Sequence, residues 1–417
     1  MAESFAEKMK RLGIVPTKDV FLCVGGLSSG SVVTSSVEKI NVDTGERKAC
    51  SPVSKPVMSA GIVTLDNFVY VLGGINVKNG PSQSTTYKYD FCTDVWTLTP
   101  SLRQPLQRHV AVIFNDNIYV IGGIGIDNTL IDSVDVFNYQ SNVWERCSTL
   151  PTPRYGCAAV VIAGGIYVIG GATVINQKTI HSNVVERYNP DTNDWDICTS
   201  MNIARLDATA TVSKRFIYVM GGTSIPRGDS INKIERFNTA TNVWSPVTDM
   251  PIPRTAHSAV SRKGFIYVAG GITRSTLDTI DSMNSADDRW MNHGKMSLPR
   301  KYFGFVIVTE DCKEEQKENP PGAVMVANDN NQVGPITNAL LAPQNSPPLP
   351  VRSNVNPVGP ITNAILSPQN PSSVVPARNN ANPIGPITNA FNPVPVPARS
   401  NANLLDPMAD IPFRNPF

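Results

Sequence analysis

A glycine pair that follows a short run of β-branched and aromatic residues occurs six times in the first 271 residues of the chain. The pairs are spaced 48 to 51 residues apart and lie at Gly25-Gly26, Gly73-Gly74, Gly122-Gly123, Gly170-Gly171, Gly221-Gly222 and Gly270-Gly271. A repeat near 50 residues, made of short strands and turns, is the sequence pattern of propeller blades. The spacing therefore predicts a β-propeller before any single residue is considered.

One repeat carries the strands of one blade. In the fourth repeat we expect an apolar strand at 158–162, a second at 166–169 that runs into its glycine pair, an alternating strand at 184–188, and a last strand with Trp195. Continuous apolar runs predict strands buried on both faces, whereas alternation predicts one face in water. The glycines permit positive φ or close backbone approach. The Trp supplies apolar surface between blades.

Further positions recur in register with the glycines. A Tyr or Phe precedes most pairs and a Trp follows most of them, and an arginine stands 16 residues before the next glycine pair, or where that pair would fall, at Arg154, Arg205, Arg254 and Arg300. In these features the sequence resembles the Kelch repeat family over residues 19–309. The resemblance implies an all-β fold, a six-bladed propeller of four-stranded antiparallel blades. The early repeats depart from it, since Arg47 replaces a Trp, and Val57 and Leu106 replace arginines.

The order of strands predicts how the ring closes. The first repeat begins at its glycine strand, residues 20–24, whereas the last repeat is followed by a surplus apolar strand at 302–308. We expect residues 303–308 to pair beside 20–24, because a ring sealed in this way leaves no unpaired edge.

Composition limits the partner classes. The net charge of the 417-residue chain is only +2, which gives no global case for nucleic acid or for membrane binding. Residues 1–13 lack the apolar core of a signal peptide, and no apolar stretch is long enough to span a bilayer. Seven cysteines without a CxxC pair suit a reducing compartment, so we expect a cytoplasmic protein. We expect no cofactor and no membrane insertion.

The titratable residues follow the repeat. His109 and His257 stand at equivalent positions, three residues after the arginine position, and the carboxylates of the alternating strands recur at Glu38, Asp135, Glu186, Glu235 and Asp281. Residues that recur with a blade period are expected to hold blades together, so we expect no catalytic residue and no metal site. Fold alone leaves open an enzyme with a small-molecule site at the propeller axis.

The family resemblance implies a partner-binding face built from the loops after each arginine position and after each glycine pair. The second set of loops contributes Asn76 to Gly80, Asn128, Gln177 and Lys178, together with two arginines. The predicted contact residues are Arg108, Arg154, Tyr155, Arg205, Arg227, Arg254, Arg274, Arg300, Lys301 and Tyr302. So many cations favour an acidic peptide through bidentate pairs. The alternative is that Arg154, Arg205, Arg254 and Arg300 form intramolecular pairs.

Two segments flank the propeller. Residues 1–18 resemble the junction at which Kelch-like ubiquitin ligase adaptors pass from their BTB and BACK domains into the propeller, and neither domain fits in this sequence. Residues 310–417 hold 20 of the 34 prolines and lack Trp and Tyr. This composition predicts a disordered Pro/Asn-rich tail.

Short motifs recur in the tail. The sequence GPITNA appears three times, around Ile336, Ile361 and Ile387, which indicates a multivalent ligand. A PxxPxR string at 347–352 fits an SH3-domain protein, and the terminal Asn415, Pro416 and Phe417 resemble the ligand of an EH-domain protein. Tandem duplication without a partner is the alternative.

The function that these features favour is a protein-protein interaction scaffold, or substrate-recognition module, that binds a partner through its loop face. An actin-binding cytoskeletal Kelch protein is the first alternative, and the axial small-molecule enzyme is the second.

Overall fold

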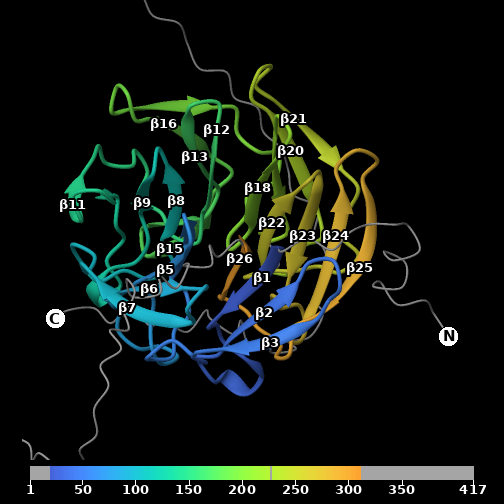
Figure 1. Ribbon diagram of the computed structural model, residues 1–417. Coiled ribbons are helices and arrows are strands. Elements are labelled where there is room, and N and C mark those ends of the chain that lie inside the picture. Colours follow the sequence, from blue (N-terminus) through green and yellow to red (C-terminus); the bar gives the residue numbers. More distant parts are fainter. Residues whose placement is uncertain (1–18, 226–227, 311–417) are drawn as a thin grey trace, which may run out of the picture. The chain divides into compact units, whose positions relative to one another are not determined.

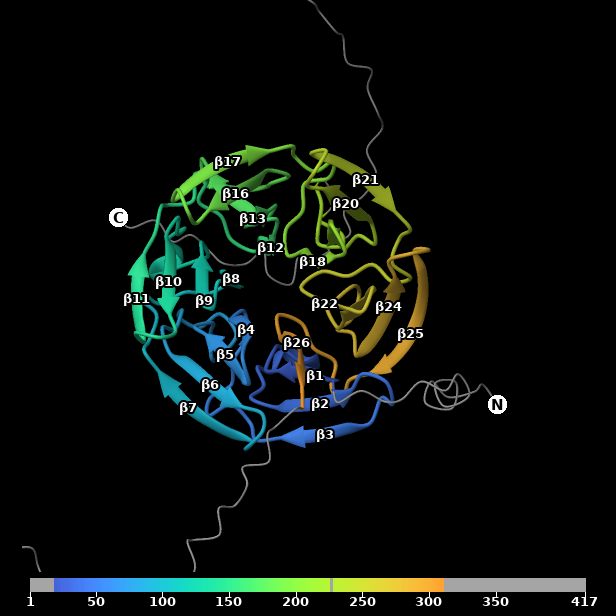
Figure 2. The ribbon, with the colours of Figure 1, turned by 45° about the horizontal axis from the view of Figure 1, so that its top comes forward.

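Six four-stranded antiparallel sheets, which we number as blades 1 to 6, form a closed ring in the residues that the structure describes (Figures 1 and 2). The structure is a computed structural model and describes residues 19–225 and 228–310. From the axis outward, the strands of blades 1 to 3 are β26 (Gly304–Thr309), β1 (Asp19–Val24), β2 (Val37–Asn41) and β3 (Arg47–Cys50); β4 (Gly61–Leu65), β5 (Phe68–Leu72), β6 (Thr86–Asp90) and β7 (Val95–Thr99); and β8 (Val110–Phe114), β9 (Asn117–Ile121), β10 (Val134–Asn138) and β11 (Val143–Arg146).

The second half of the ring repeats the pattern. The strands of blades 4 to 6 are β12 (Ala158–Ile162), β13 (Gly165–Ile169), β16 (Val185–Asn189) and β17 (Asp194–Cys198); β18 (Thr209–Ser213), β19 (Phe216–Met220), β20 (Ile234–Asn238) and β21 (Val243–Val247); and β22 (Ser258–Arg262), β23 (Phe265–Ala269), β24 (Thr279–Asn284) and β25 (Arg289–Lys295). The connecting loops hold the short 3-10 helices η1 (Ser29–Ser31) and η2 (Ile126–Asn128) and a hairpin of β14 (Ala172–Ile175) and β15 (Lys178–His181). The predicted all-β, six-bladed fold is confirmed.

Ring closure also follows the prediction. β26 pairs antiparallel with β1 through all six of its residues, from Gly304 opposite Val24 to Thr309 opposite Asp19. Figure 2 shows β26 at the axial end of blade 1, beside β1. The first blade therefore takes its innermost strand from the far end of the propeller sequence.

The two ends of the ring differ. One end, the loop face, carries the long connections from the second to the third strand of each blade (25–36, 73–85, 122–133, 170–184, 221–233, 270–278) and from the fourth strand to the next blade (51–60, 100–109, 147–157, 199–208, 248–257, 296–303). The other end, the turn face, carries the short hairpin turns. The predicted contact loops all lie on the loop face.

The glycine pairs explain how neighbouring blades approach each other. In blade 5, Gly221 and Gly222 have φ of +59° and +89°. A Cβ on Gly221 would lie 2.4 Å from the carbonyl oxygen of Arg254, the residue that leads into blade 6. The N–H of Gly222 donates to the same oxygen at 2.8 Å. The pair thus serves both predicted purposes, left-handed backbone and close contact.

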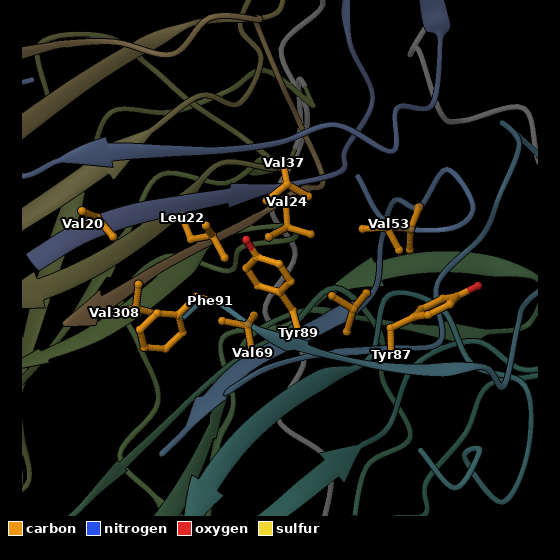
Figure 3. Close-up of a cluster of buried hydrophobic side chains, with 12 residues drawn as sticks. Val20, Leu22, Val24, Val37, Val53, Val69, Tyr87, Tyr89, Phe91 and Val308 are labelled. Carbon is orange, nitrogen blue, oxygen red and sulfur yellow. The ribbon is translucent and has the colours of Figure 1, made fainter. Parts of the chain in front are cut away.

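Apolar side chains from adjacent blades interlock. Figure 3 shows the contact between blades 1 and 2, in which side chains of β1 such as Leu22 and Val24 face Tyr89 of β6. On the outer strands the Trp stacks on the aromatic ring opposite, as in Tyr89–Trp96 with centroids 4.6 Å apart. The indole Nε1 of Trp96 donates to the carbonyl of Ser51 in the preceding blade. The predicted role of the Trp between blades is confirmed here.

A channel follows the propeller axis. The six innermost strands lie nearest the centre of the ring (Figure 2) and line a cavity of about 450 Å³. Its walls are small or branched side chains, among them Thr64, Ala159, Ala210 and Ala259. Small residues at these positions keep the axis open.

Candidate partner-binding face

The four periodic arginines lie inside the blades. Their side chains are at most 1 % exposed, and each guanidinium pairs with a carboxylate on the third strand of its own blade: Arg154 with Glu186, Arg205 with Glu235, Arg254 with Asp281 and Arg300 with Glu38. Each also donates from Nη1 to the carbonyl of the first glycine, as from Arg205 to Gly221 at 2.9 Å. A partner could not reach these groups. The structure assigns them to the intramolecular pairs that the sequence left open, which corrects their place among the contact residues.

Blades 2 and 3 show how the pair is replaced. In blade 2 both members are apolar, because Val57 stands at the arginine position and Tyr87 at the carboxylate position, and both belong to one buried cluster. In blade 3 the carboxylate of Asp135 remains and is neutralised from outside by Arg103 and Arg146. The chain therefore pairs or removes both charges, as burial requires.

The other predicted site residues fall into four groups. Tyr155 and Lys301 are buried, and Arg108 and Tyr302 lie at the axis. Arg274 is exposed on the loop face. Arg227 and the tail residues Ile336, Ile361, Ile387, Asn415, Pro416 and Phe417 lie outside the described residues.

Six residues, one from each blade, form a ring of backbone hydrogen bonds around the axis, at the position two residues after the arginine position. We call this the axial ring; it consists of Ser59, Arg108, Gly156, Asp207, Ala256 and Tyr302. All six have φ between +51° and +58°. Each N–H donates to the carbonyl of the ring residue in the preceding blade at 2.8 to 3.0 Å, and Ser59 closes the circle onto Tyr302.

The axial ring stores strain, because the left-handed region costs a non-glycine residue of order 1 kcal/mol. Five of its six members are not glycine. The closed circle of hydrogen bonds satisfies the backbone groups that would otherwise be buried without partners. Strain that the surrounding structure holds in place in this way is a common mark of functional sites.

Three side chains of the axial ring contact one another, and these residue types do not recur at the equivalent positions of the other blades. Nη2 of Arg108 pairs with Oδ2 of Asp207 at 2.5 Å, and the hydroxyl of Tyr302 donates to the same oxygen at 2.9 Å. The guanidinium of Arg108 also lies over the ring of Tyr155, 4.6 Å from its centroid. Burial alone would lower the pKa of Arg108, but the Asp207 carboxylate outweighs it and holds that pKa above its ordinary value. The group is thus a fixed ion pair across blades 3 and 5.

The pair crosses over Gly156 of the intervening blade. A Cβ there would lie 2.5 Å from Oδ1 of Asp207 and 3.3 Å from Nη2 of Arg108. The sequence prediction named Arg108 and Tyr302 as separate contacts and missed Asp207. An alignment of the six repeats at this one position would have shown the signal, since it holds Ser, Arg, Gly, Asp, Ala and Tyr in turn.

Two buried histidines lie next to the axial ring. Burial lowers the pKa of His109 to about 4, and burial with Arg254 and Arg205 lowers that of His257 to about 3. Both imidazoles are therefore neutral near pH 7. No group of three His, Cys, Asp or Glu side chains in residues 19–225 and 228–310 is arranged to hold a metal ion.

These histidines predict a loss of stability in mild acid. The unfolded chain binds protons below about pH 6.5, whereas the folded chain binds them only near pH 4 and below, so stability is full above pH 6.5 and falls as the pH drops. Each histidine contributes about 1.4 kcal/mol per pH unit in this window. We expect His257→Phe, which copies Phe303 at the same position in blade 1, to reduce the pH dependence of stability by the contribution of this one histidine, about 1.4 kcal/mol per pH unit. Urea unfolding at pH 7.5 and pH 5 measures the change in the free energy of unfolding between the two conditions. If this change were the same in His257→Phe and in the wild type, the role of His257 would be refuted.

Exposed aliphatic side chains lie on the loop face, in loops of the same face as the axial ring. Five of the loops that follow a glycine pair each present one valine or isoleucine that is 53 to 60 % exposed: Val32, Val77, Ile126, Ile175 and Ile225. We call these residues the apolar rim. Val77, Ile126 and Ile225 stand at the same offset from their glycines, where blade 6 has Arg274. The remaining large apolar side chains that are exposed among the described residues lie on the outer strands or at Ile180 and Leu298.

The blades, glycine pairs and buried arginine pairs define a Kelch-type β-propeller. Residues 69–288, more than half of the chain, match the family model described as the Attractin/LZTR1 beta-propeller, and the chain belongs to that family.

Relatives of the chain carry Kelch names. It is 30 % identical over 104 residues to Kelch-like protein terF of Aspergillus terreus, covering 24 % of this chain and 23 % of that protein. It is 25 % identical over 208 residues to Kelch repeat and BTB domain-containing protein 1 of Vaccinia virus (49 % and 36 %), and 26 % identical over 217 residues to Kelch repeat protein M-T8 of Myxoma virus (52 % and 41 %). The matches thus span less than half the length of these relatives.

A solved structure titled "Structure of YjhT" shares the fold, with a TM-score of 0.56, 15 % identity and coverage of 67 % of this chain and 95 % of that one. Among the described residues, no helix is long and apolar enough to cross a membrane.

Proposed function

We propose that the chain is a protein-recognition module that binds its partner on the loop face. The observation that carries this proposal is the apolar rim, which places one exposed aliphatic side chain on five of six neighbouring loops. Exposed apolar side chains on one face of a protein mark an interaction site when they form a contiguous patch. Kelch propellers are generally interaction modules, which agrees with a binding role rather than a catalytic one.

The structure changes the partner chemistry that we propose. Five of the cations that favoured an acidic peptide are buried, namely the four periodic arginines and Lys301, and Arg108 is neutralised by Asp207. The exposed charges of the glycine-pair loops are mixed, with Lys78, Lys178 and Arg274 beside Asp127 and Asp229. We therefore propose a partner that contributes apolar side chains to the rim. The tail motifs remain a proposed second binding segment, for SH3- or EH-domain proteins.

Charge placed on the apolar rim should abolish partner binding. Val32→Asp with Val77→Asp should weaken a quantified partner interaction by about 100-fold or more, because each would bury an unpaired carboxylate at the interface. The melting temperature should stay unchanged, since both valines are 60 % exposed. The matched control is Val95→Asp with Val143→Asp, two valines 50 % exposed on β7 and β11 of the outer wall. Wild-type affinity in the rim variant, or an equal loss in the control, would contradict the proposal.

A further inference from the structure

Cys92 differs from the other cysteines that the structure describes, because it is disulfide-bonded. It lies exposed in the hairpin turn between β6 and β7, on the turn face of blade 2. The other five cysteines in residues 19–225 and 228–310 are free thiols: Cys23, Cys50, Cys147, Cys157 and Cys198. The sequence holds seven cysteines, and the one that remains is Cys312, which lies outside the described residues.

The turn itself does not require a cysteine. In every blade the residue at this place donates its N–H to Oδ1 of the Asn or Asp two positions earlier, as Cys92 does to Asp90 at 2.9 Å. This hydrogen bond fixes the backbone of the turn and leaves the side chain open to variation. The residues that take the place of Cys92 in the other blades are Asp43, Gln140, Asp191, Ala240 and Ala286. The blade pattern therefore does not explain the cysteine of blade 2.

The closing strand β26 leads toward this turn. Phe91, the residue before the bonded cysteine, packs in one buried cluster with Val308 of β26, and Figure 3 shows its ring beside Val308. Two residues further on, Glu310 accepts a hydrogen bond from Nζ of Lys39. Lys39 lies on the same face of β2 as Val37, since strand residues alternate, and Val37 belongs to the same cluster. The chain thus leaves β26 along the border between blades 1 and 2.

We propose that Cys92 and Cys312 form a disulfide that closes the propeller covalently. Cys312 follows Val308 by four residues, which span at most about 14 Å. Val308 packs with Phe91, the residue next to Cys92. Bridged cysteines have Cα atoms about 4.4–6.8 Å apart, so a chain that leaves β26 on this side can reach the turn. The proposal does not depend on the apolar rim.

The bond turns the ring of blades into a covalent circle. From Cys92 the chain runs through blades 3 to 6 and into β26 of blade 1, once around the axis, and the disulfide leads from there back to blade 2 (Figure 2). Without the bond, β26 is held on this side only by hydrogen bonds to β1 and by packing. The strand that closes the ring is therefore tethered at both ends in the oxidised chain and at one end in the reduced chain.

The bond forms by exchange with a low-molecular-weight disulfide such as oxidised glutathione. The thiolate of one cysteine attacks the glutathione disulfide and releases one glutathione thiolate, and the second cysteine attacks the mixed disulfide and releases the other. The two cysteines lose two protons and two electrons, and the two sulfurs of oxidised glutathione gain them. Excess thiol reverses the exchange, which makes the closure sensitive to the redox conditions.

Peptide mapping tests the pairing. The full chain is incubated with oxidised glutathione or with dithiothreitol, denatured in the presence of N-ethylmaleimide, and digested with trypsin. Trypsin places Cys92 and Cys312 on separate peptides, 89–103 and 302–313, with no other cysteine on either. We expect the two peptides to be linked after oxidation, and separate and alkylated after reduction. Alkylated Cys92 in the oxidised chain, or its linkage to a different cysteine, would overturn the proposal.

Thermal unfolding tests the effect on closure. We expect the oxidised chain to melt roughly 5 °C above the reduced chain, because the bond restricts the unfolded state. Cys92→Ser should abolish this difference. The matched control is Cys198→Ser, which removes a partly exposed free thiol at the end of β17 and should keep the difference. Equal melting temperatures of the oxidised and reduced wild type, or a difference that persists in Cys92→Ser, would contradict the covalent closure.

Discussion

A chain truncated before Gly304 should lose the cooperative unfolding transition of the propeller. The truncation removes β26, and with it every backbone hydrogen bond between the C-terminal strand and β1 that closes the ring. β1 would become an exposed edge, and the buried side chains of Phe305 and Val308 would leave the clusters on either side of blade 1. We expect an aggregating or partly folded chain without a single melting transition.

The control for this truncation ends after Glu310. It lacks residues 311–417 as well, so the two chains differ only by residues 304–310. We expect the longer chain to keep the melting temperature of the reduced full chain, measured by circular dichroism and calorimetry. A native transition in the shorter chain would show that the closure by β26 is dispensable.

Removal of one buried arginine should destabilise the propeller by about 3–5 kcal/mol, because it leaves an unpaired carboxylate inside a blade. In Arg205→Val the carboxylate of Glu235 keeps only Asn202 as a donor among the described residues, and the carbonyls of Gly221 and Lys233 lose the Nη1 donor. Chemical unfolding measures the loss. Glu235→Tyr alone should lower the free energy of unfolding by a similar amount, since it leaves the buried guanidinium of Arg205 without its carboxylate partner.

The double variant Arg205→Val with Glu235→Tyr copies the Val57 and Tyr87 of blade 2. We expect it to recover most of the stability, because replacing a buried ion pair by apolar groups is often neutral. An exposed pair in the same blade, Lys233 with Asp249, is the control, and Lys233→Ala should cost no more than about 1 kcal/mol. If the double variant were as unstable as the sum of the single ones, the apolar pair of blade 2 would not be an equivalent solution.

The glycine pairs made the fold predictable because the backbone itself requires glycine at these positions. Positive φ together with a carbonyl 2.4 Å from the place of a Cβ admits few other residues, so the period is visible without any structure. The surplus strand at 302–308 made ring closure predictable because the backbone groups of a strand need a neighbouring strand to pair with, and the first repeat lacked one strand.

The periodic arginines were ambiguous because their side chains suit two environments. Arg154, for example, begins in a surface loop, yet its guanidinium reaches Glu186 inside the blade. Chain position gives the place of the Cα but not the direction of a long side chain. The burial of such an arginine therefore needs coordinates.

The axial ring was missed for a different reason. All six members have left-handed backbone, but only Gly156 is a residue type from which such a conformation can be expected in the sequence. Hydrogen bonds from neighbouring blades hold the other five residues in this conformation. Such a constraint comes from tertiary structure. Asp207 also lies outside the set of residues that recur with the blades, and its partners Arg108 and Tyr302 lie in other blades.

The pairing of Asp19 with Thr309 has a practical consequence for how the protein is tethered. Both residues lie at the turn face, so a surface, tag or fused domain attached beyond either of them starts from the end of the ring opposite the loop face. A strand of six residues spans roughly 20 Å. A propeller anchored directly at Asp19 or at Thr309 would thus turn its loop face, with the apolar rim, away from the anchor.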